Sequence, residues 1–487
     1  MRQVILGGEL KGRGFGGRTL PETLILALST LIGFLFAVVT QEITDIITGA
    51  TLIGIAFVLT YPGSIFRGRT PLALLTHSAY SAFRTFAHTD HFDPEAMDKK
   101  GKPIATAPLM IGDVKGVDLW FDNDQLIYLM RHQGSPSFYT VAFEVEGMEE
   151  STTEDHPYIG WGQVQARAAE RTSAISHVQS LARSVPIDMT DHLLWLSDYV
   201  SPDAPDSIVR SYQDLSENVK EKAEMHRSYV VIRIDSGAAL TRATVAAGNG
   251  MEGTFAAIIR ESKSLMDKAV QLGAIRKYRP LDSSLAKALM RHLQNPHFDI
   301  DDATSSGNPW LPYNRRDSKI GIRFGDGPLT RVGYIPRDGF ESAVLSVHSL
   351  RQLVSGIYPP VPHTVSWINA LSDAKQARQK ARRHLTSDRA KKNERTKKGI
   401  VSDGTDEVLE NASQQRLFDL KPGTGHHGAD WAAYISYSAD TEDQLLEIAN
   451  TIESVANGAG VKTIEWLDQR RDLALSAVLP LGRGIRQ

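Results

Sequence analysis

The chain has no cysteine among its 487 residues. Disulfide frameworks, thiol catalysis, iron–sulfur clusters and cysteine-type zinc sites are therefore excluded. The sequence also lacks the string G-x-x-x-x-G-K-[ST] of phosphate-binding loops, the H-E-x-x-H pair of zinc proteases and the G-x-S-x-G turn of serine hydrolases. Lys and Arg total 54 against 57 Asp and Glu, so a net charge of -3 excludes binding to nucleic acid through bulk positive charge.

Long uncharged stretches are confined to the beginning of the chain. Nineteen residues separate Glu22 from Glu42, and twenty-one separate Asp45 from Arg67, and neither stretch contains a charged residue. A helix needs about 20 apolar residues to cross the hydrocarbon core of a bilayer. The sequence therefore predicts two transmembrane helices joined by a short turn, a hairpin over residues 23–66.

The positions of Lys and Arg predict the orientation of this hairpin. The turn contains none of them, whereas both flanks do: Arg2, Lys11, Arg13 and Arg18 before it, and Arg67, Arg69 and Arg84 after it. Cytoplasmic flanks of membrane helices carry an excess of these cations. We therefore expect an inner-membrane protein with both termini in the cytoplasm and with Arg18, Arg67 and Arg69 at the membrane interface.

Two other structures contain similar apolar segments. A signal peptide is one, although the first stretch follows a long leading segment and has no A-x-A cleavage site after it. A buried helical pair of a soluble protein is the other. The twin uncharged stretches and the asymmetry of the cations favour the membrane hairpin over both.

The remaining chain has mixed strand and helix patterns, which predict an α+β fold with mostly antiparallel sheets. Three strand patterns separated by short polar turns predict an antiparallel meander over 117–145. The apolar spacing at 159–184 and 252–272 is that of amphipathic helices. Residues 193–196 have the pattern of a short strand, and 399–428 that of a loop.

A weak internal repeat relates two parts of this region. A strand and a helix lead to Leu281-Asp282, and a second strand and helix lead to Leu467-Asp468. Because chance similarity between such units is common, the pattern leaves both a duplication and a coincidence open.

We expect six segments along the chain. They are a basic cytoplasmic tail (1–22), the transmembrane hairpin (23–66), a membrane-proximal helix and linker (67–116), a cytosolic α+β domain (117–370), a basic helix and linker (371–427), and a C-terminal strand–helix–strand unit packed on the main domain (428–487).

The densest group of metal-ligand residue types consists of His88, Asp90, His91, Asp93 and Glu95. Zinc accepts histidine and carboxylate ligands. The group is local and has no distant ligand or positioned base, so a polar linker is the favoured interpretation. The alternative is a membrane-anchored metal-dependent hydrolase or nuclease. We expect no metal, no cofactor and no catalytic residue.

Eleven cations and two carboxylates between Lys375 and Lys398 predict a long basic helix over 371–398. A solvated helix is the simplest interpretation. Attraction to anionic lipid, binding to DNA phosphate by a membrane-tethered protein, and contact with an acidic partner are the alternatives. A partner-facing or phosphate-facing surface would consist of Arg382, Arg383, Arg389, Lys391, Lys392 and Arg395.

This layout resembles a family of actinobacterial conjugative-transfer membrane proteins from type IV secretion-like loci. The matching features are Gly68-Arg69-Thr70-Pro71-Leu72 after the second span, the meander at 117–145, Trp161, the strand Tyr229–Ile234, the basic helix at 371–398 and the closing Leu479-Pro480-Leu481-Gly482. The acidic segment 146–155 and the His-rich loop 88–91 depart from the pattern.

In that family, a two-helix segment similar to a small membrane subunit of the channel precedes a cytosolic region like the N-terminal half of the conjugation ATPase, without its motor domain. The resemblance implies a structural, non-enzymatic subunit of a DNA-transfer apparatus. The implied partners are a conjugation or secretion ATPase, other channel subunits, the lipid bilayer and further copies within the complex. Nucleic acid contact through 371–398 is a further alternative.

Overall fold

A computed structural model describes residues 3–4, 20–39, 43–61, 70–86, 91–92, 114–122, 124–134, 137–147, 156–187, 190–201, 203–301, 315–336, 339–340, 345–346, 349–397, 405–421, 426–468 and 471–484. The chain divides into two units. We call Glu9–Asp90 the helical unit, and Met1–Gly8 together with His91–Gln487 the large unit.

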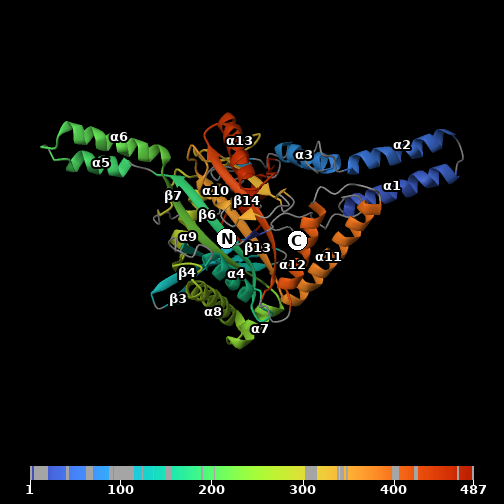
Figure 1. The fold of residues 1–487 in the computed structure, drawn as a ribbon, viewed down its shortest axis with the longest axis horizontal. Helices are drawn as coiled ribbons and strands as arrows, with labels where there is room; N and C mark the ends of the chain where they lie inside the picture. Colours follow the sequence, from blue (N-terminus) through green and yellow to red (C-terminus); the bar gives the residue numbers. More distant parts are fainter. Residues whose placement is uncertain are drawn as a thin grey trace, which may run out of the picture. The chain divides into compact units, whose positions relative to one another are not determined.

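The described part of the helical unit contains α1 (Leu20–Val39), α2 (Ile43–Thr60) and α3 (Pro71–Phe86). α1 and α2 lie side by side along their length (Figure 1). Each of the two predicted apolar stretches therefore contains one helix, and the two helices pack against each other.

One antiparallel sheet of thirteen strands organises the large unit. Its order is β2 (His91–Phe92), β9 (Arg315–Asp317), β10 (Ile322–Phe324), β11 (Leu329–Ile335), β14 (Gly428–Ala439), β13 (His363–Ser372), β6 (Ile175–Pro186), β7 (Glu224–Asp235), β5 (Phe138–Glu146), β4 (Gln125–His132) and β3 (Val114–Asp122). β8 (Lys277–Pro280) also pairs with β5, and β15 (Glu465–Trp466) with β11. A separate pair joins β1 (Gln3–Val4) to β12 (Leu345–Ser346).

The two halves of the sheet meet at β6 and β13 and contain the same series of elements. The first half runs β3, β4, β5, α4 (His156–Ala168), β6, α5 (Thr190–Tyr199), α6 (Asp206–Lys222), β7, α8 (Gly250–Gln271), β8 and α9 (Ser283–Gln294). The second runs β9, β10, β11, α10 (Gln352–Ser355), β13, α11 (Ala374–Lys397), α12 (Thr405–Asp419), β14, α13 (Glu442–Gly458), β15 and α14 (Arg471–Ser476). α7 (Ala238–Ala246), the 3₁₀ helix Ser349–Arg351 and β12 are additions to this series.

Equivalent hydrogen bonds extend this likeness to the register of the strands. The amide of Leu281 donates to the carbonyl of Ala142 at 3.0 Å, and that of Leu467 donates to the carbonyl of Val332 at 2.9 Å. In both halves, therefore, the leucine of the Leu-Asp pair bonds to the equivalent residue of the third strand, which is β5 in the first half and β11 in the second.

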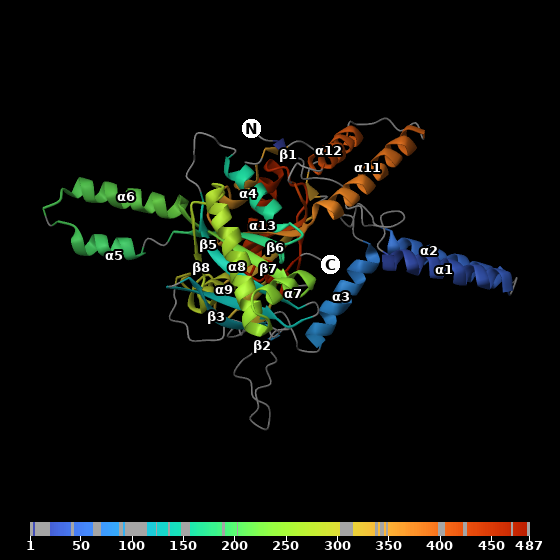
Figure 2. The ribbon, with the colours of Figure 1, turned by 90° about the horizontal axis from the view of Figure 1, so that it is seen from below.

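Both faces of the sheet are covered (Figure 2). On one face, α9, α14 and the C-terminal residues 477–484 build a single core with side chains from both halves, such as Leu181, Leu289 and Leu479. On the other, α4 and α8 cover a core of the first half, and α10 and α13 cover a separate core of the second half. The fold is mixed α+β around a large antiparallel sheet, as predicted.

Three local predictions were wrong. Residues 159–184 do not form one helix: α4 ends at Ala168 and β6 begins at Ile175. β6 pairs with β7 on one side and β13 on the other, so pairing with distant strands outweighs a helical spacing of apolar residues. The short strand expected at 193–196 lies in α5, and the expected loop at 399–428 contains α12.

The meander at 117–145 is confirmed as β3, β4 and β5. The first strand of the C-terminal unit expected at 428–487 is β14, which lies between β13 and β11. The segment 428–487 therefore contributes a strand to the main sheet and a covering segment to its face.

Candidate functional site

α2 is the one helix, among the residues that the structure describes, that is long and apolar enough to cross a membrane by length and composition. Only 17% of this 18-residue helix is buried. α1 has 20 residues, but its apolar part Glu22–Phe36 is shorter than a span. The two-span hairpin therefore stays a prediction.

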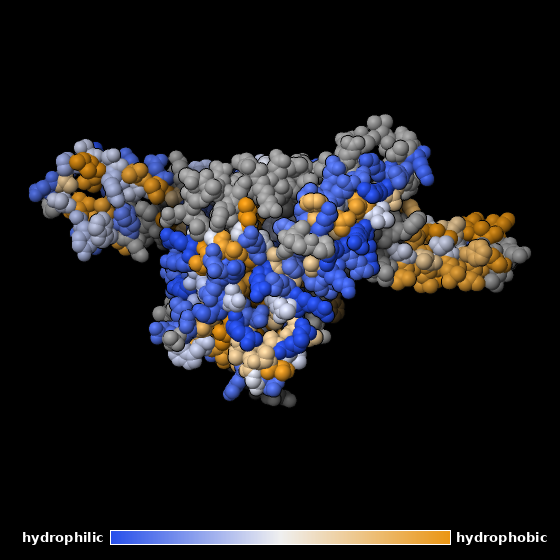
Figure 3. Space-filling view, turned by 60° about the horizontal axis from the view of Figure 1, so that its bottom comes forward, coloured by the Kyte–Doolittle hydropathy of each residue, from blue (hydrophilic) through white to orange (hydrophobic). Residues whose placement is uncertain are grey.

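Large apolar side chains are exposed along both helices (Figure 3). Phe34 of α1 is 64% exposed and Ile43 of α2 is 76% exposed. Their exposed apolar neighbours include Leu24, Leu28, Leu31, Ile47, Ile55 and Val58. Continuous exposed apolar surface of this kind marks a site that lipid or another protein covers.

Two glycines bring α1 and α2 into backbone contact. A Cβ atom at Gly33 would lie 2.9 Å from the carbonyl oxygen of Gly49, and one at Gly49 would lie 2.7 Å from the carbonyl oxygen of Gly33. Close approach through small residues is typical of helix pairs in membranes, where packing rather than the hydrophobic effect holds helices together. Gly54 of α2 makes no such contact, since no atom lies within 4 Å of its Cβ position.

Five hydroxyl side chains of α1 and α2 are bonded to the backbone of their own helix. The hydroxyls donate to the carbonyl four residues earlier at 2.7 to 2.8 Å: Ser29, Thr30, Thr48, Thr51 and Thr60. The buried Glu22 carboxyl accepts a hydrogen bond from Thr70. Internal bonding lowers the cost of placing these groups in an apolar medium.

The segments on either side of the helical unit both pair with strands of the large unit. β1 pairs with β12, and β2 pairs with β9. A chain that leaves a folded unit and returns to it can cross a membrane only an even number of times. This topology limits any membrane crossing by the helical unit to zero or two spans.

Several predicted residues lie outside the described ranges. Arg18, Arg67 and Arg69 are among them, as are His88, Asp90, Asp93 and Glu95 of the 88–95 group. His91 is in β2. Among the described residues, no group of three or more His, Asp or Glu side chains is placed to hold a metal ion.

The predicted basic helix is α11, which packs on α12 through Ala377, Ala381 and Leu420. Arg382 and Arg383 are exposed on it, and Lys391 and Arg395 belong to the same helix.

Glu410 of α12 binds two cations of α11, Lys392 at 3.0 Å and Arg389 at 3.2 Å. Hydrogen bonds from Lys392 and Arg389 lower the pKa of Glu410. Two of the six predicted surface cations therefore also hold α11 to α12.

A buried polar seam at the centre of the sheet was not predicted. The side-chain amide nitrogen of Gln179 lies 3.0 Å from the Ser366 hydroxyl and 3.1 Å and 3.0 Å from the carbonyl oxygens of Ala477 and Leu479. Its amide oxygen accepts from the backbone N–H of Gly482 at 2.8 Å. Gln179 thus fixes the C-terminal segment across the junction of β6 and β13.

Arg183 belongs to the same seam. Its Nε donates to Nε2 of His292 at 3.1 Å, and its Nη1 donates to the hydroxyl of Thr364 at 3.2 Å. Burial lowers the pKa of Arg183 to about 9, and burial with the nearby Arg183 lowers the pKa of His292 to about 4. Neutral His292 is therefore the acceptor, with Nδ1–H donating to the carbonyl of Phe298 at 2.7 Å.

Ser184, His226 and Glu224 have the residue types of a nucleophilic triad. The Ser184 hydroxyl lies 2.8 Å from Nδ1 of His226, whose Nε2 lies 3.6 Å from Glu224. Ser184 is fully buried, however, and its hydroxyl donates to the carbonyl of Val354 at 2.8 Å. A substrate has no access to this hydroxyl. The three residues therefore hold neighbouring segments together and do not have the geometry of a catalytic site.

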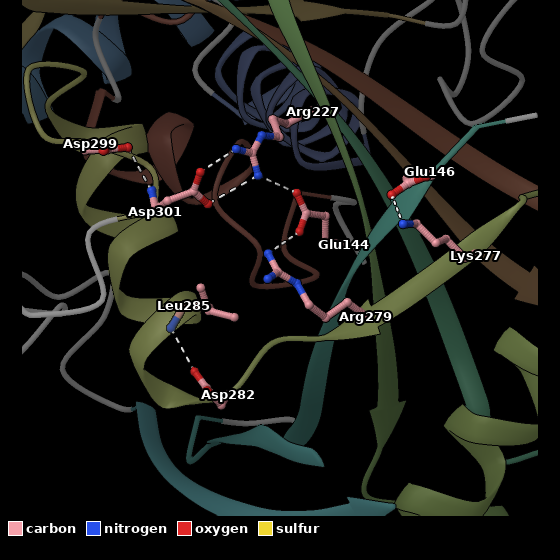
Figure 4. Close-up of polar contacts among 9 residues, drawn as sticks. All are labelled: Glu144, Glu146, Arg227, Lys277, Arg279, Asp282, Leu285, Asp299 and Asp301. Carbon is pink, nitrogen blue, oxygen red and sulfur yellow. Dashed lines mark hydrogen bonds and ion pairs between the residues drawn. The ribbon is translucent and has the colours of Figure 1, made fainter. Parts of the chain in front are cut away.

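An ion-pair network beside β5, β7 and β8 is also structural (Figure 4). Arg227 binds Glu144 at 2.7 Å and also binds Asp301, while Arg279 binds the other oxygen of Glu144. Two cations pair with two carboxylates in this network. The network ties the turn after α9 to the sheet.

Comparison with models of known protein families finds no match, and comparison with curated proteins finds none either. The apolar helix pair α1–α2 and the basic helix α11 are therefore the features that indicate a function.

Proposed function

We propose that this protein is a membrane-anchored structural subunit of a conjugative DNA-transfer apparatus of the type IV secretion kind. The helical unit anchors it in the inner membrane, and the large unit docks a partner ATPase in the cytoplasm. The observation that carries the anchor is the pair α1–α2, with its exposed apolar side chains and its contact between Gly33 and Gly49. The resemblance of the sequence to the conjugative-transfer family supports the assignment to a DNA-transfer apparatus.

The proposed anchor has two spans with both flanks cytoplasmic. The pairing of β1 and β2 with strands of one unit supports an even number of crossings. The Lys and Arg residues on both flanks, and their absence from the turn, support the cytoplasmic side.

We further propose that the large unit is an internal duplication. The shared series of elements and the equivalent bonds of Leu281 and Leu467 support it. A duplication would explain why a helical hairpin, α5–α6 or α11–α12, is inserted at the same point of each half.

The role is that of a scaffold, and the ATPase supplies the motor. α11 is a proposed docking surface for another subunit of the apparatus, because Arg382 and Arg383 present positive charge to solvent. A membrane-tethered DNA-binding protein is the second candidate, favoured by the same charges. Salt-dependent retention of duplex DNA that is lost in the R382Q/R383Q variant would favour this second candidate.

Topology is tested most directly by cysteine labelling, since the natural chain has no cysteine. Gln41→Cys places a thiol in the turn that the sequence predicts, and Gln376→Cys places one on the exposed face of α11. A membrane-impermeant thiol reagent added to intact cells should label the first and not the second. Labelling of both or neither, or recovery of the full chain from lysed cells without detergent, contradicts the anchor.

The glycine contact is tested with a matched pair. Gly33→Leu should separate α1 from α2 and weaken their association by about 1–2 kcal/mol, whereas Gly54→Leu should have little effect. Resistance of the detergent-solubilised full chain to limited proteolysis reports this association. Equal behaviour of the two variants would mean that the helices do not pack through Gly33.

The apparatus is tested by pull-down from the native host. The tagged full chain should retain the P-loop ATPase encoded in the same locus, and an unrelated tagged membrane hairpin should not. A chain that purifies alone contradicts the scaffolding role while leaving the anchor intact.

A further inference from the structure

The α5–α6 hairpin extends away from the sheet and exposes apolar and aromatic side chains (Figures 1 and 2). Trp195 is 54% exposed, Tyr199 71% and Ile208 62%. Figure 3 shows these two helices as a mixture of apolar and polar surface. Tyr and Trp with large exposed areas are the residues that dominate the energy of protein interfaces.

The rings of this hairpin are held in fixed positions. The ring of Trp195 stacks on Tyr199 with a centroid distance of 5.4 Å and on His192 at 6.1 Å. Nε2 of His192 lies 3.1 Å from the hydroxyl of Tyr212 on the second helix. A preorganised aromatic surface loses little side-chain entropy when it binds.

The same hairpin is acidic. Residues 190–222 contain seven carboxylates and three cations, a net charge of -4: Asp191, Asp198, Asp203, Asp206, Asp214, Glu217 and Glu221 against Arg210, Lys220 and Lys222. This sign disfavours anionic lipid and nucleic acid and favours a cationic partner.

The hairpin inserted at the equivalent point of the second half has the opposite character. α11 contains ten cations and two carboxylates, a net charge of +8. Arg382 and Arg383 are exposed there, and in the described part of the chain neither takes part in an ion pair. Arginine stacks on aromatic faces and pairs with carboxylates, which are the two features of the α5–α6 surface.

The two surfaces cannot meet within one copy. β6 and β13 are antiparallel, and Ser184 near the end of β6 pairs with His363 at the start of β13. α5 and α11 therefore leave the sheet at opposite ends. A cationic surface that suits α5–α6 and an acidic surface that suits α11 are therefore available to each copy on another copy of the same chain.

We propose that the α5–α6 hairpin of one copy binds α11 of a second copy, with Arg382 and Arg383 against Trp195 and Tyr199. Because the two surfaces differ, the contact is head-to-tail and builds a closed ring or an open filament. The proposal identifies the subunit that docks on α11 as a second copy of this chain, and to that extent it rests on the proposed function. Self-association itself requires neither an ATPase nor DNA.

The test uses the purified full chain in detergent and two variants with exposed substitutions. W195A/Y199A removes the aromatic surface, and R382E/R383E reverses the basic one. Analytical ultracentrifugation should show concentration-dependent association of the wild type and at least about tenfold weaker association of each variant alone. An equimolar mixture of the two variants should form a dimer and stop there, because each variant keeps one intact surface.

The control variant R171E/R242E reverses two exposed cations elsewhere and should associate as the wild type does. Far-UV circular dichroism and thermal unfolding check that every variant is folded. Rising NaCl should weaken wild-type association, since exposed charges are screened. A monomeric wild type, or a variant mixture that stays monomeric, overturns the proposal. The ATPase pull-down with wild-type protein reports separately on the proposed function.

Discussion

The two halves of the sheet follow the same path but fill it with different side chains. In the first half, Phe143 on β5 pairs with Pro280 on β8. At the equivalent place in the second half, Gly333 on β11 pairs with Trp466 on β15. The large ring lies on the long strand in one half and on the short strand in the other. The two halves therefore share the pairing of their backbones and differ in which strand carries the bulky side chain.

Removing the large ring from the first half should have the largest effect. Phe143 is fully buried, with Phe121 and Tyr278 at ring-centroid distances of 5.4 and 5.7 Å. Phe143→Ala leaves a cavity among these rings and should lower the free energy of unfolding by about 3–5 kcal/mol. Denaturant titration measures it, and a loss below about 1 kcal/mol would show that the neighbours can collapse into the space.

The reverse change in the second half should destabilise by overpacking, since Gly333 has no room for a side chain. A Cβ there would lie 2.6 Å from Ile464 and 2.8 Å from the Trp466 ring. Gly333→Ala should cost about 1–3 kcal/mol in the same titration. Gly162 in α4 has open space at its Cβ position, so Gly162→Ala is the control and should be neutral or stabilising. Equal results for the two alanines would refute the packing difference.

The two Leu-Asp pairs should also differ in their response to substitution. Asp468 binds Nε and Nη2 of Arg331 at 2.9 and 2.7 Å, and the Arg331 side chain is only 7% exposed. Asp468→Ala leaves that charge buried and should cost about 3 kcal/mol. Asp282 instead caps α9 by accepting from the amide of Leu285 at 2.9 Å, so Asp282→Ala should cost about 1 kcal/mol. Thermal unfolding of both variants measures the difference, and a reversed order would contradict these roles.

Lowering the pH should decrease the stability by a smaller amount, mainly through buried histidines of the first half. The pKa of His292 is lowered to about 4, below its unfolded value of about 6.5, so the unfolded chain binds the extra proton. The free energy of unfolding should therefore fall as the pH drops from 6.5 towards 4, by an amount on the order of 2 kcal/mol for this group. His292→Gln should flatten the pH dependence of stability in this window. An unchanged slope would mean that other groups, such as His177 with a pKa also near 4, determine it.

Local patterns predicted the elements whose partners are close in sequence. The meander β3–β5 was found because its strands alternate and its turns are short and polar. α8 was found because its apolar residues recur at helical spacing.

Distant partners explain what was missed. β6 has both neighbours, β7 and β13, far along the chain, and its polar Gln179 and Arg183 are buried only because other segments cover them. α12 was missed because its burial depends on α11. The aromatic surface of α5–α6 was missed because the apolar run at 193–196, which contains Trp195, has the local pattern of a short strand.

Residues 477–484 cover the junction of β6 and β13, and their place at the end of the chain affects the order in which the protein folds during synthesis. The core that both halves share lacks side chains such as Leu475, Leu479 and Leu481 until the ribosome has made them. The helical unit, in contrast, ends at Asp90 and can fold while hundreds of residues are still to be translated. If the helical unit is the anchor that we propose, anchoring precedes assembly of the large unit, and each nascent chain folds where it is already held at the membrane.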